Sequence, residues 1–137
     1  FGDPETQAVL PLLKSDLLTV MRAVENETLA ETPVEFEDKA SCCVMLASGG
    51  YPEKYEKGKV IDFGASESMA QVFHSGTARG DCGNFVTSGG RVLGVCCVRD
   101  TLSEAVDAAY AAANEIHFDK MHFRKDIGAR ALKGTEV

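Results

Sequence analysis

A glycine-rich loop supplies the first residues of this 137-residue sequence that could do chemistry. Gly49 and Gly50 follow an apolar run, and without a Cβ atom their backbone N–H groups can approach an anion closely. Lys57 and Lys59 follow in the same loop and, on an extended segment, would point to the same side. The loop therefore predicts either an anion-binding site or a well-solvated turn.

A basic motif near the end of the chain is the second candidate. Arg124 carries a planar fork of donors that suits a phosphate group, and Lys125 adds a point charge. Asp126 could accept a hydrogen bond from a sugar hydroxyl or brace one of the two cations. Taken alone, the motif fits a basic helix end equally well, because cations stabilise the C-terminal end of a helix dipole.

The start of the chain places carboxylates at a predicted helix N-terminus. The pattern predicts Asp3 as N-cap, Pro4 at the first helical position and Glu5 beside the positive end of the dipole. Helix capping accounts for Asp3 and Glu5 but not for Gln7, so a ligand-binding role for this stretch stays open.

Composition excludes several classes of protein. A hydrophobic content of 45% and a charged content of 26% are typical of a globular domain. The net charge of −7 argues against nucleic-acid binding, which needs a basic face. We find neither a signal peptide nor an apolar stretch long enough to span a membrane. His74, His117 and His122 match no metal or catalytic motif, so no metal site is expected in this chain.

Five cysteines indicate a reducing compartment. Cys42-Cys43 and Cys96-Cys97 are adjacent pairs, and neighbours in a strand point to opposite faces, so neither pair suits a disulfide. Cys82 stands alone. We interpret all five as small apolar residues or free thiols in the cytoplasm, with at least one member of each pair buried.

The elements that position these residues are predicted as strands followed by a helix. The apolar run 40–47 is short enough for a strand, and further strands begin at 59–61 and 71–73. Residues 84–87 and 91–98 flank Ser88-Gly89-Gly90, which predicts a hairpin. Consecutive strands without intervening helices favour a mostly antiparallel sheet in an α+β fold.

Two helical regions flank these strands. Thr101 and Glu104 form a capping box that opens a helix rich in alanine, which should pack close to the sheet. Near the N-terminus, Pro11 should bend or interrupt the first helix, and Ser15-Asp16 should restart it. An apolar stripe that predicts docking on a core recurs at spacings of three and four: Leu10, Leu13, Leu17, Met21 and Val24.

Six stretches in order resemble the C-terminal part of the glycinamide ribonucleotide synthetase family, the phosphoribosylamine–glycine ligases, which are ATP-grasp enzymes. The stretches are 1–7 (FGDPETQ), 47–52 (ASGGYP), 55–61 (YEKGKVI), 72–77 (VFHSGT), 87–95 (TSGGRVLGV) and 124–128 (RKDIG). The resemblance covers almost the whole chain. Together with the absence of an initiating methionine, it indicates a piece of a larger protein.

The resemblance implies an activity and a place for this segment within it. Family members use ATP to phosphorylate glycine, and the amine of 5-phosphoribosylamine then attacks the acyl phosphate. ATP and Mg²⁺ or Mn²⁺ would be held outside this segment, with the metal ligands just upstream of Phe1. No catalytic residue is expected within it, and the isolated segment should be inactive. Residues 1–30 would end the ATP-grasp domain, and 31–137 would form a C-terminal β-rich domain with a small barrel- or sandwich-like sheet.

Within the segment, the resemblance and the chemistry above select one set of residues for binding small-molecule substrates. The predicted substrate-binding residues are Asp3, Glu5, Gln7, Gly49, Gly50, Tyr51, Lys57, Lys59, Arg124, Lys125 and Asp126. A carrier module is disfavoured, because the predicted hairpin tip at Ser88-Gly89-Gly90 has no lysine to modify. A structural lid that touches no substrate remains the alternative.

Overall fold

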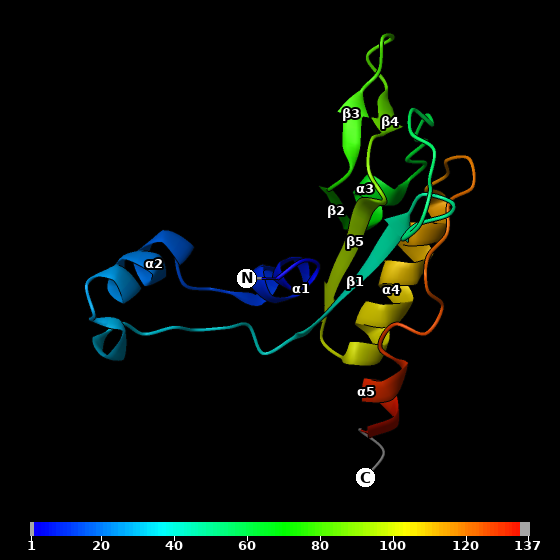
Figure 1. Cartoon of the computed structure of the whole chain (residues 1–137). Coiled ribbons are helices and arrows are strands. Elements are labelled where there is room, and N and C mark those ends of the chain that lie inside the picture. Colours follow the sequence, from blue (N-terminus) through cyan, green and yellow to red (C-terminus); the bar gives the residue numbers. More distant parts are fainter. Residues whose placement is uncertain (1, 135–137) are drawn as a thin grey trace.

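The computed structural model describes residues 2–134 and shows two open antiparallel sheets with flanking helices (Figure 1). β1 (Ala40–Ala47), β5 (Arg91–Arg99) and β2 (Gln71–His74) form the first sheet in the order β1-β5-β2. β3 (Thr77–Arg79) and β4 (Phe85–Thr87) form the second sheet. The α+β antiparallel prediction is confirmed, but neither sheet of the described part closes into a barrel.

The core lies between the larger sheet and α4 (Leu102–Glu115). Val44 and Leu46 of β1 pair with Val95 and Leu93 of β5, and all four side chains are fully buried. The predicted capping box of α4 is present. The alanines that α4 buries allow its backbone to lie close to the sheet, as predicted; they are Ala105, Ala109, Ala112 and Ala113.

The predicted hairpin across 88–90 is wrong, because β4 and β5 belong to different sheets. Gly76 and Gly89 lie in close contact where the chain passes from one sheet to the other. The amides of Ser88 and Gly89 both donate to the carbonyl of Gly76, at 2.7 and 3.1 Å. The strand predicted from 59 to 61 is also absent, since Val60 makes only an isolated bridge.

The N-terminal region is helical but starts differently from the prediction. α1 (Glu5–Val9) has Pro4, without a side-chain cap, at its N-cap position, so Asp3 is not the cap. Pro11 does interrupt the helix, because a short 3₁₀ turn, η1 (Leu10–Leu12), follows α1. α2 (Leu17–Glu25) then restarts on Asp16, whose carboxylate accepts the Thr19 amide at 3.1 Å.

Residues 13–37 form an arm that stands away from the sheet in Figure 1 and carries α2 and a second 3₁₀ turn, η2 (Leu29–Glu31). The second half of the predicted apolar stripe lies on this arm and is not covered by the core of this domain, so its docking stays a prediction. Met21 and Val24 are 49% and 58% exposed, and their neighbour Leu18 is 57% exposed. Two short helices, α3 (Ser66–Met69) and α5 (Ala129–Gly134), complete the fold. None of the described helices is long and apolar enough to cross a membrane.

Candidate anion-binding site

A cavity of about 170 Å³ opens where the glycine-rich loop, the start of β5 and the segment after α4 meet. Its lining includes Tyr51 and Arg124, which were predicted from sequence, and Arg91 and His122, which were not. Phe123 supplies an aromatic wall between the two basic side chains of its own segment. Most of the lining surface is apolar, with Met45, Ala47 and Ile127 also contributing, and the four residues with hydrogen-bond donors lie around it.

Residue Ala47, the last of β1, brings three of these segments together. On one side Ala47 pairs with Arg91 of β5. On the other side its amide donates to the carbonyl of His122 at 2.9 Å, and its carbonyl accepts the His122 amide at 3.0 Å. Arg91 and His122 are therefore held on either side of the strand end from which the glycine-rich loop departs.

The glycine-rich loop is fixed by contacts that require its two glycines. Gly50 has a φ of +94°, and a Cβ there would meet the carbonyl of Lys54. A Cβ on Gly49 would lie 2.7 Å from the carbonyl oxygen of Lys120. The loop is tied to the start of β5, because the Ser48 amide donates to the Gly90 carbonyl at 2.8 Å. The amides of Gly49 and Gly50 donate to no other described residue, so both keep a donor to offer.

Arg91 is oriented by the motif at the start of the chain. Its guanidinium donates to the Asp3 carbonyl at 2.8 Å and lies 3.3 Å from the Asp3 carboxylate. Gln7, one turn along α1, donates its side-chain amide to the same carboxylate at 2.9 Å. Asp3 and Gln7 therefore act together to hold Arg91 rather than to cap α1. The buried Oε1 atom of Gln7 has no partner among the described residues, so it can accept a further hydrogen bond.

Arg124 is braced by Asp126, one of the two roles that the sequence left open for this carboxylate. The bidentate pair has N–O distances of 2.8 and 2.7 Å, and it raises the pKa of Arg124 while lowering that of Asp126. Tyr110 of α4 fixes the segment, because its hydroxyl donates to the Arg124 carbonyl and accepts the Ile127 amide. Lys125 instead stacks its ammonium 3.9 Å from the centre of the Phe123 ring.

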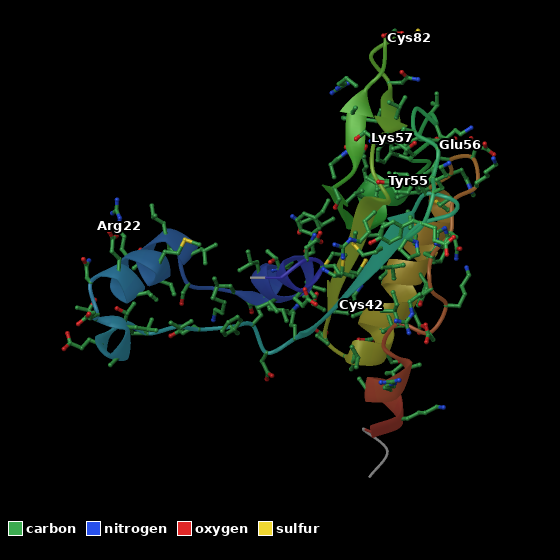
Figure 2. The ribbon with its side chains drawn as sticks, in the orientation of Figure 1. Arg22, Cys42, Tyr55, Glu56, Lys57 and Cys82 are labelled. Carbon is green, nitrogen blue, oxygen red and sulfur yellow. The ribbon has the colours of Figure 1, made fainter. Side chains whose placement is uncertain are left out.

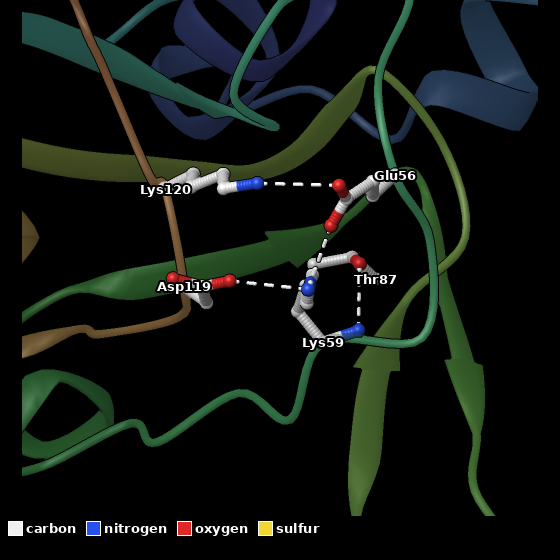
Figure 3. Close-up of polar contacts among 5 residues, drawn as sticks. All are labelled: Glu56, Lys59, Thr87, Asp119 and Lys120. Atoms are coloured by element: carbon white, nitrogen blue, oxygen red, sulfur yellow. Dashed lines mark hydrogen bonds and ion pairs between the residues drawn. The ribbon is translucent and has the colours of Figure 1, made fainter.

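The lysines of the loop do not join the cavity lining. Lys59 pairs with Glu56 at 2.8 Å and with Asp119 at 3.1 Å, and Lys120 pairs with Glu56 at 3.2 Å (Figure 3). The hydrogen bond from Lys59 lowers the pKa of Glu56, and the same contact raises the pKa of Lys59. Because two carboxylates already surround Lys59, it is poorly placed to bind a phosphate.

Lys57 and Glu5 also lie apart from the cavity lining. Figure 2 shows Lys57 on the exposed loop beside Tyr55 and Glu56, far from Arg22 on the arm. Glu5 lies in the first turn of α1, as predicted. Substrate contacts by these two residues, and by Lys59, stay predictions.

Sequence reasoning missed Arg91 and His122 for different reasons. Arg91 was visible, since it lies in the stretch 87–95 that carries the family resemblance, but the hairpin interpretation gave it no partner. His122 carried no local signal, because only its pairing with Ala47 brings it to the cavity.

No metal-binding cluster accompanies the cavity. The described residues contain no group of three or more His, Cys, Asp or Glu side chains arranged to hold an ion. Asp3 and Asp126, the carboxylates nearest the cavity, are each engaged with an arginine. The residues present thus fit a phosphate or carboxylate group better than a divalent cation.

The fold and the cavity together define a small α+β domain with a mostly apolar cavity, bordered by two arginines, at the end of an open antiparallel sheet. Residues 41–130 match the family described as phosphoribosylglycinamide synthetase, C domain. The chain belongs to this family, which confirms the resemblance carried by the six stretches.

Relatives of known name agree with this assignment. The chain is 46% identical over 131 residues to a phosphoribosylamine–glycine ligase of Fusobacterium nucleatum, covering 93% of this chain and 30% of that protein. It is 48% identical over 133 residues to a bifunctional purine biosynthetic protein of Schizosaccharomyces pombe, covering 96% of this chain and 17% of the relative.

A solved structure shares the fold. The crystal structure of phosphoribosylamine–glycine ligase from Thermotoga maritima superposes with a TM-score of 0.74 at 34% identity, over 93% of this chain and 31% of that one. The chain therefore spans about a third or less of the length of the relatives it matches.

Proposed function

We propose that this chain is the C-terminal domain of a phosphoribosylamine–glycine ligase, an enzyme that joins glycine to 5-phosphoribosylamine at the expense of ATP in purine biosynthesis. The proposal assigns to this domain the binding of the phosphoribosyl group in the cavity lined by Tyr51, Arg91, His122 and Arg124. The observation that carries the assignment is the convergence of two carboxylate-braced arginines on one cavity.

The braced arginines suit a phosphate because bracing leaves donors unused. A guanidinium has five N–H donors. Asp126 engages Nε and Nη2 of Arg124, and Asp3 engages Nη1 and Nη2 of Arg91, so each arginine keeps N–H groups to direct at a ligand. Each carboxylate restricts the conformations of its arginine, which reduces the conformational entropy lost on binding. Held at its phosphate, the substrate would present its amine at a fixed distance from the reacting acyl phosphate.

ATP and the metal ion are placed outside this segment in the proposal. The Fusobacterium nucleatum ligase is about three times as long as this chain, and the described residues offer no cluster for a cation. The segment alone would then bind a phosphorylated ligand without catalysing ligation. The free, mostly buried thiols suit the cytoplasm, where purine precursors would be made.

The test is steady-state kinetics on the full-length ligase with each substrate varied separately. Arg124→Ala removes a charge-assisted hydrogen bond worth about 1.5–3 kcal/mol, which corresponds to a KM for phosphoribosylamine that rises about tenfold to a hundredfold. Arg91→Ala should have an effect of the same order, whereas the KM for ATP should stay nearly unchanged. Arg99→Ala is the matched control, because Arg99 lies at the opposite end of β5. If the variants at 91 and 124 match the control, the domain is a structural lid instead.

We further propose that the arm belongs with the ATP-grasp part of the enzyme, in line with a domain boundary near residue 30. Its support is the exposed apolar side chains of Leu18, Met21 and Val24, which contact neither the sheet nor α4. In the full-length ligase, Met21→Lys should lower the thermal unfolding temperature, because it would bury a charge at that interface. Thr19→Lys, on the opposite side of α2, is the control and should have little effect. Equal effects of both substitutions would contradict the docking.

A further inference from the structure

Four of the five cysteines form two cross-strand pairs on neighbouring strands. Cys42 lies opposite Cys97, and Cys43 lies opposite Cys96, in the antiparallel pairing of β1 with β5. Successive strand residues point to opposite faces, so the two pairs are separated by the sheet. Cys42 and Cys97 belong to the core beneath α4, whereas Cys96 contacts Gln7 of α1 on the other face.

Cys43 and Cys96 lie directly opposite each other in the β1–β5 pairing, an arrangement that favours a disulfide. Directly opposite residues of antiparallel strands have Cα atoms about 4.5–5.5 Å apart, within the range of about 4.4–6.8 Å that a disulfide spans. The neighbouring Cys96 thiol raises the pKa of Cys43, and the neighbouring Cys43 thiol lowers that of Cys96 to about 7.

The two thiols differ in accessibility. Cys43 is partly exposed and lines a surface pocket of about 300 Å³ together with Pro4, Glu5 and Ala8 at α1. Cys96 is only 2% exposed, and its thiol donates to the Gln7 carbonyl at 3.1 Å. A small reagent from solvent therefore reaches Cys43 first.

We propose that Cys43 and Cys96 form a reversible redox pair that takes a low-molecular-weight disulfide such as oxidised glutathione as its oxidant. The Cys43 thiol, which is the accessible one, loses its proton as its sulfur attacks one sulfur of the small disulfide; this gives a mixed disulfide, and the released thiolate takes up the proton. The Cys96 thiolate then attacks the Cys43 sulfur, forms the protein disulfide and releases the second thiolate. The cysteines lose two electrons, the small disulfide gains them, and the two cysteine protons end on the two released thiols.

The redox state of this pair is coupled to α1. In the disulfide, Cys96 has no S–H group, so the hydrogen bond to the Gln7 carbonyl is lost. The Gln7 side chain holds Asp3, and Asp3 holds Arg91 at the cavity. Oxidation therefore loosens the helix that orients Arg91, whereas the pair Cys42 and Cys97, buried on the other face, has no such connection.

The test is redox titration of the purified protein with mixtures of oxidised and reduced glutathione, followed by alkylation, trypsin digestion and mass spectrometry. A Cys82→Ser background removes the exposed thiol at the tip between β3 and β4. Trypsin cleavage leaves Cys42 and Cys43 in peptide 40–54, and Cys96 and Cys97 in peptide 92–99. We expect these two peptides to be joined, with a loss of two hydrogen atoms, and to separate again when reduced glutathione is in excess.

Variants identify which pair has reacted. The cross-link should persist in Cys42→Ala and Cys97→Ala and disappear in Cys43→Ser and Cys96→Ser. The proposal is overturned if the cross-link survives in Cys43→Ser, if it is lost in Cys97→Ala, or if glutathione stops at a stable mixed disulfide. It is also overturned if no cross-link forms under conditions in which Cys82 of the parent protein is glutathionylated.

Hydrogen exchange tests the coupling to α1. After oxidation, amides of residues 5–12 should exchange at least several-fold faster, while those of α4 keep their protection. Unchanged exchange in residues 5–12, despite a complete Cys43–Cys96 cross-link, would refute the coupling. Cys43→Ser treated with the same oxidant is the control and should show no change in either region.

Discussion

Substituting Gly50 by alanine is the sharpest test of how the glycine-rich loop is built, because Gly58 of the same loop offers a matched control. Both glycines have positive φ angles, +94° and +79°. A Cβ at Gly58 would meet no atom within 4 Å, whereas one at Gly50 would collide with the carbonyl of Lys54. Gly58→Ala therefore measures the cost of the backbone conformation alone, and Gly50→Ala adds a steric clash with the backbone.

The two costs can be estimated separately. A left-handed conformation costs a residue with a side chain about 1–2 kcal/mol, which is the expected loss for Gly58→Ala. Overpacking in a fixed environment costs about 1–3 kcal/mol more, so Gly50→Ala should lose roughly 2–5 kcal/mol in total. Because Tyr51 follows Gly50 directly, the same change should also displace the Tyr51 ring from the cavity.

The assay is urea unfolding of the 137-residue chain, followed by far-ultraviolet circular dichroism because the sequence contains no tryptophan. The free energy of unfolding should fall by at least 1 kcal/mol more for Gly50→Ala than for Gly58→Ala. If both variants lose the same amount, the clash with Lys54 does not constrain the loop. That result would refute the steric explanation for glycine at position 50.

Two further predictions concern local interactions. Thr101→Ala removes the hydroxyl that accepts the Glu104 amide at 3.3 Å and should destabilise the chain by about 1 kcal/mol in urea unfolding, whereas Ser103→Ala in the same turn should be nearly neutral. Glu56→Gln removes a carboxylate whose pKa is lowered by Lys59, so the wild type should be the more stable above about pH 4.5 and lose this advantage as the pH falls below the lowered pKa. The measurement is the thermal unfolding temperature of wild type and Glu56→Gln as a function of pH, with Glu53→Gln as control. A difference in unfolding temperature that does not change with pH would contradict the ion pair.

Local patterns were sufficient for the elements whose signals lie within a few residues. The strand β1 (Ala40–Ala47) follows from an apolar run of the right length, and α4 follows from a capping box and an apolar stripe. The N-cap at Asp16 is of the same kind, since the side chain bonds an amide three residues away. Each of these features depends on neighbours in sequence, so sequence reasoning could find it.

Predictions failed where a distant segment competes for the same residues. The stretch around Ser88–Gly90 has the pattern of a hairpin turn. In the structure, however, the carbonyl of Gly76 accepts the amides of Ser88 and Gly89, and β4 and β5 belong to separate sheets. The start of the chain reads as a capping motif, but Asp3 is engaged by Arg91, 88 residues away. Apolar spacing in α2 predicted docking on a core, but spacing alone does not say which surface a helix contacts.

The sequence by itself determined the fold class, the main strand and helix of the core and the family, because hydrophobic period, caps and motif order are local properties of the chain. It also selected Tyr51 and Arg124, two of the four polar residues that line the cavity. Only the tertiary structure added Arg91 and His122, through their pairing with Ala47, and showed that Lys59 is neutralised by Glu56 and Asp119. The physical reason is that the charge of a side chain depends only on its residue type. The group that pairs with this charge depends on which distant segments pack beside it.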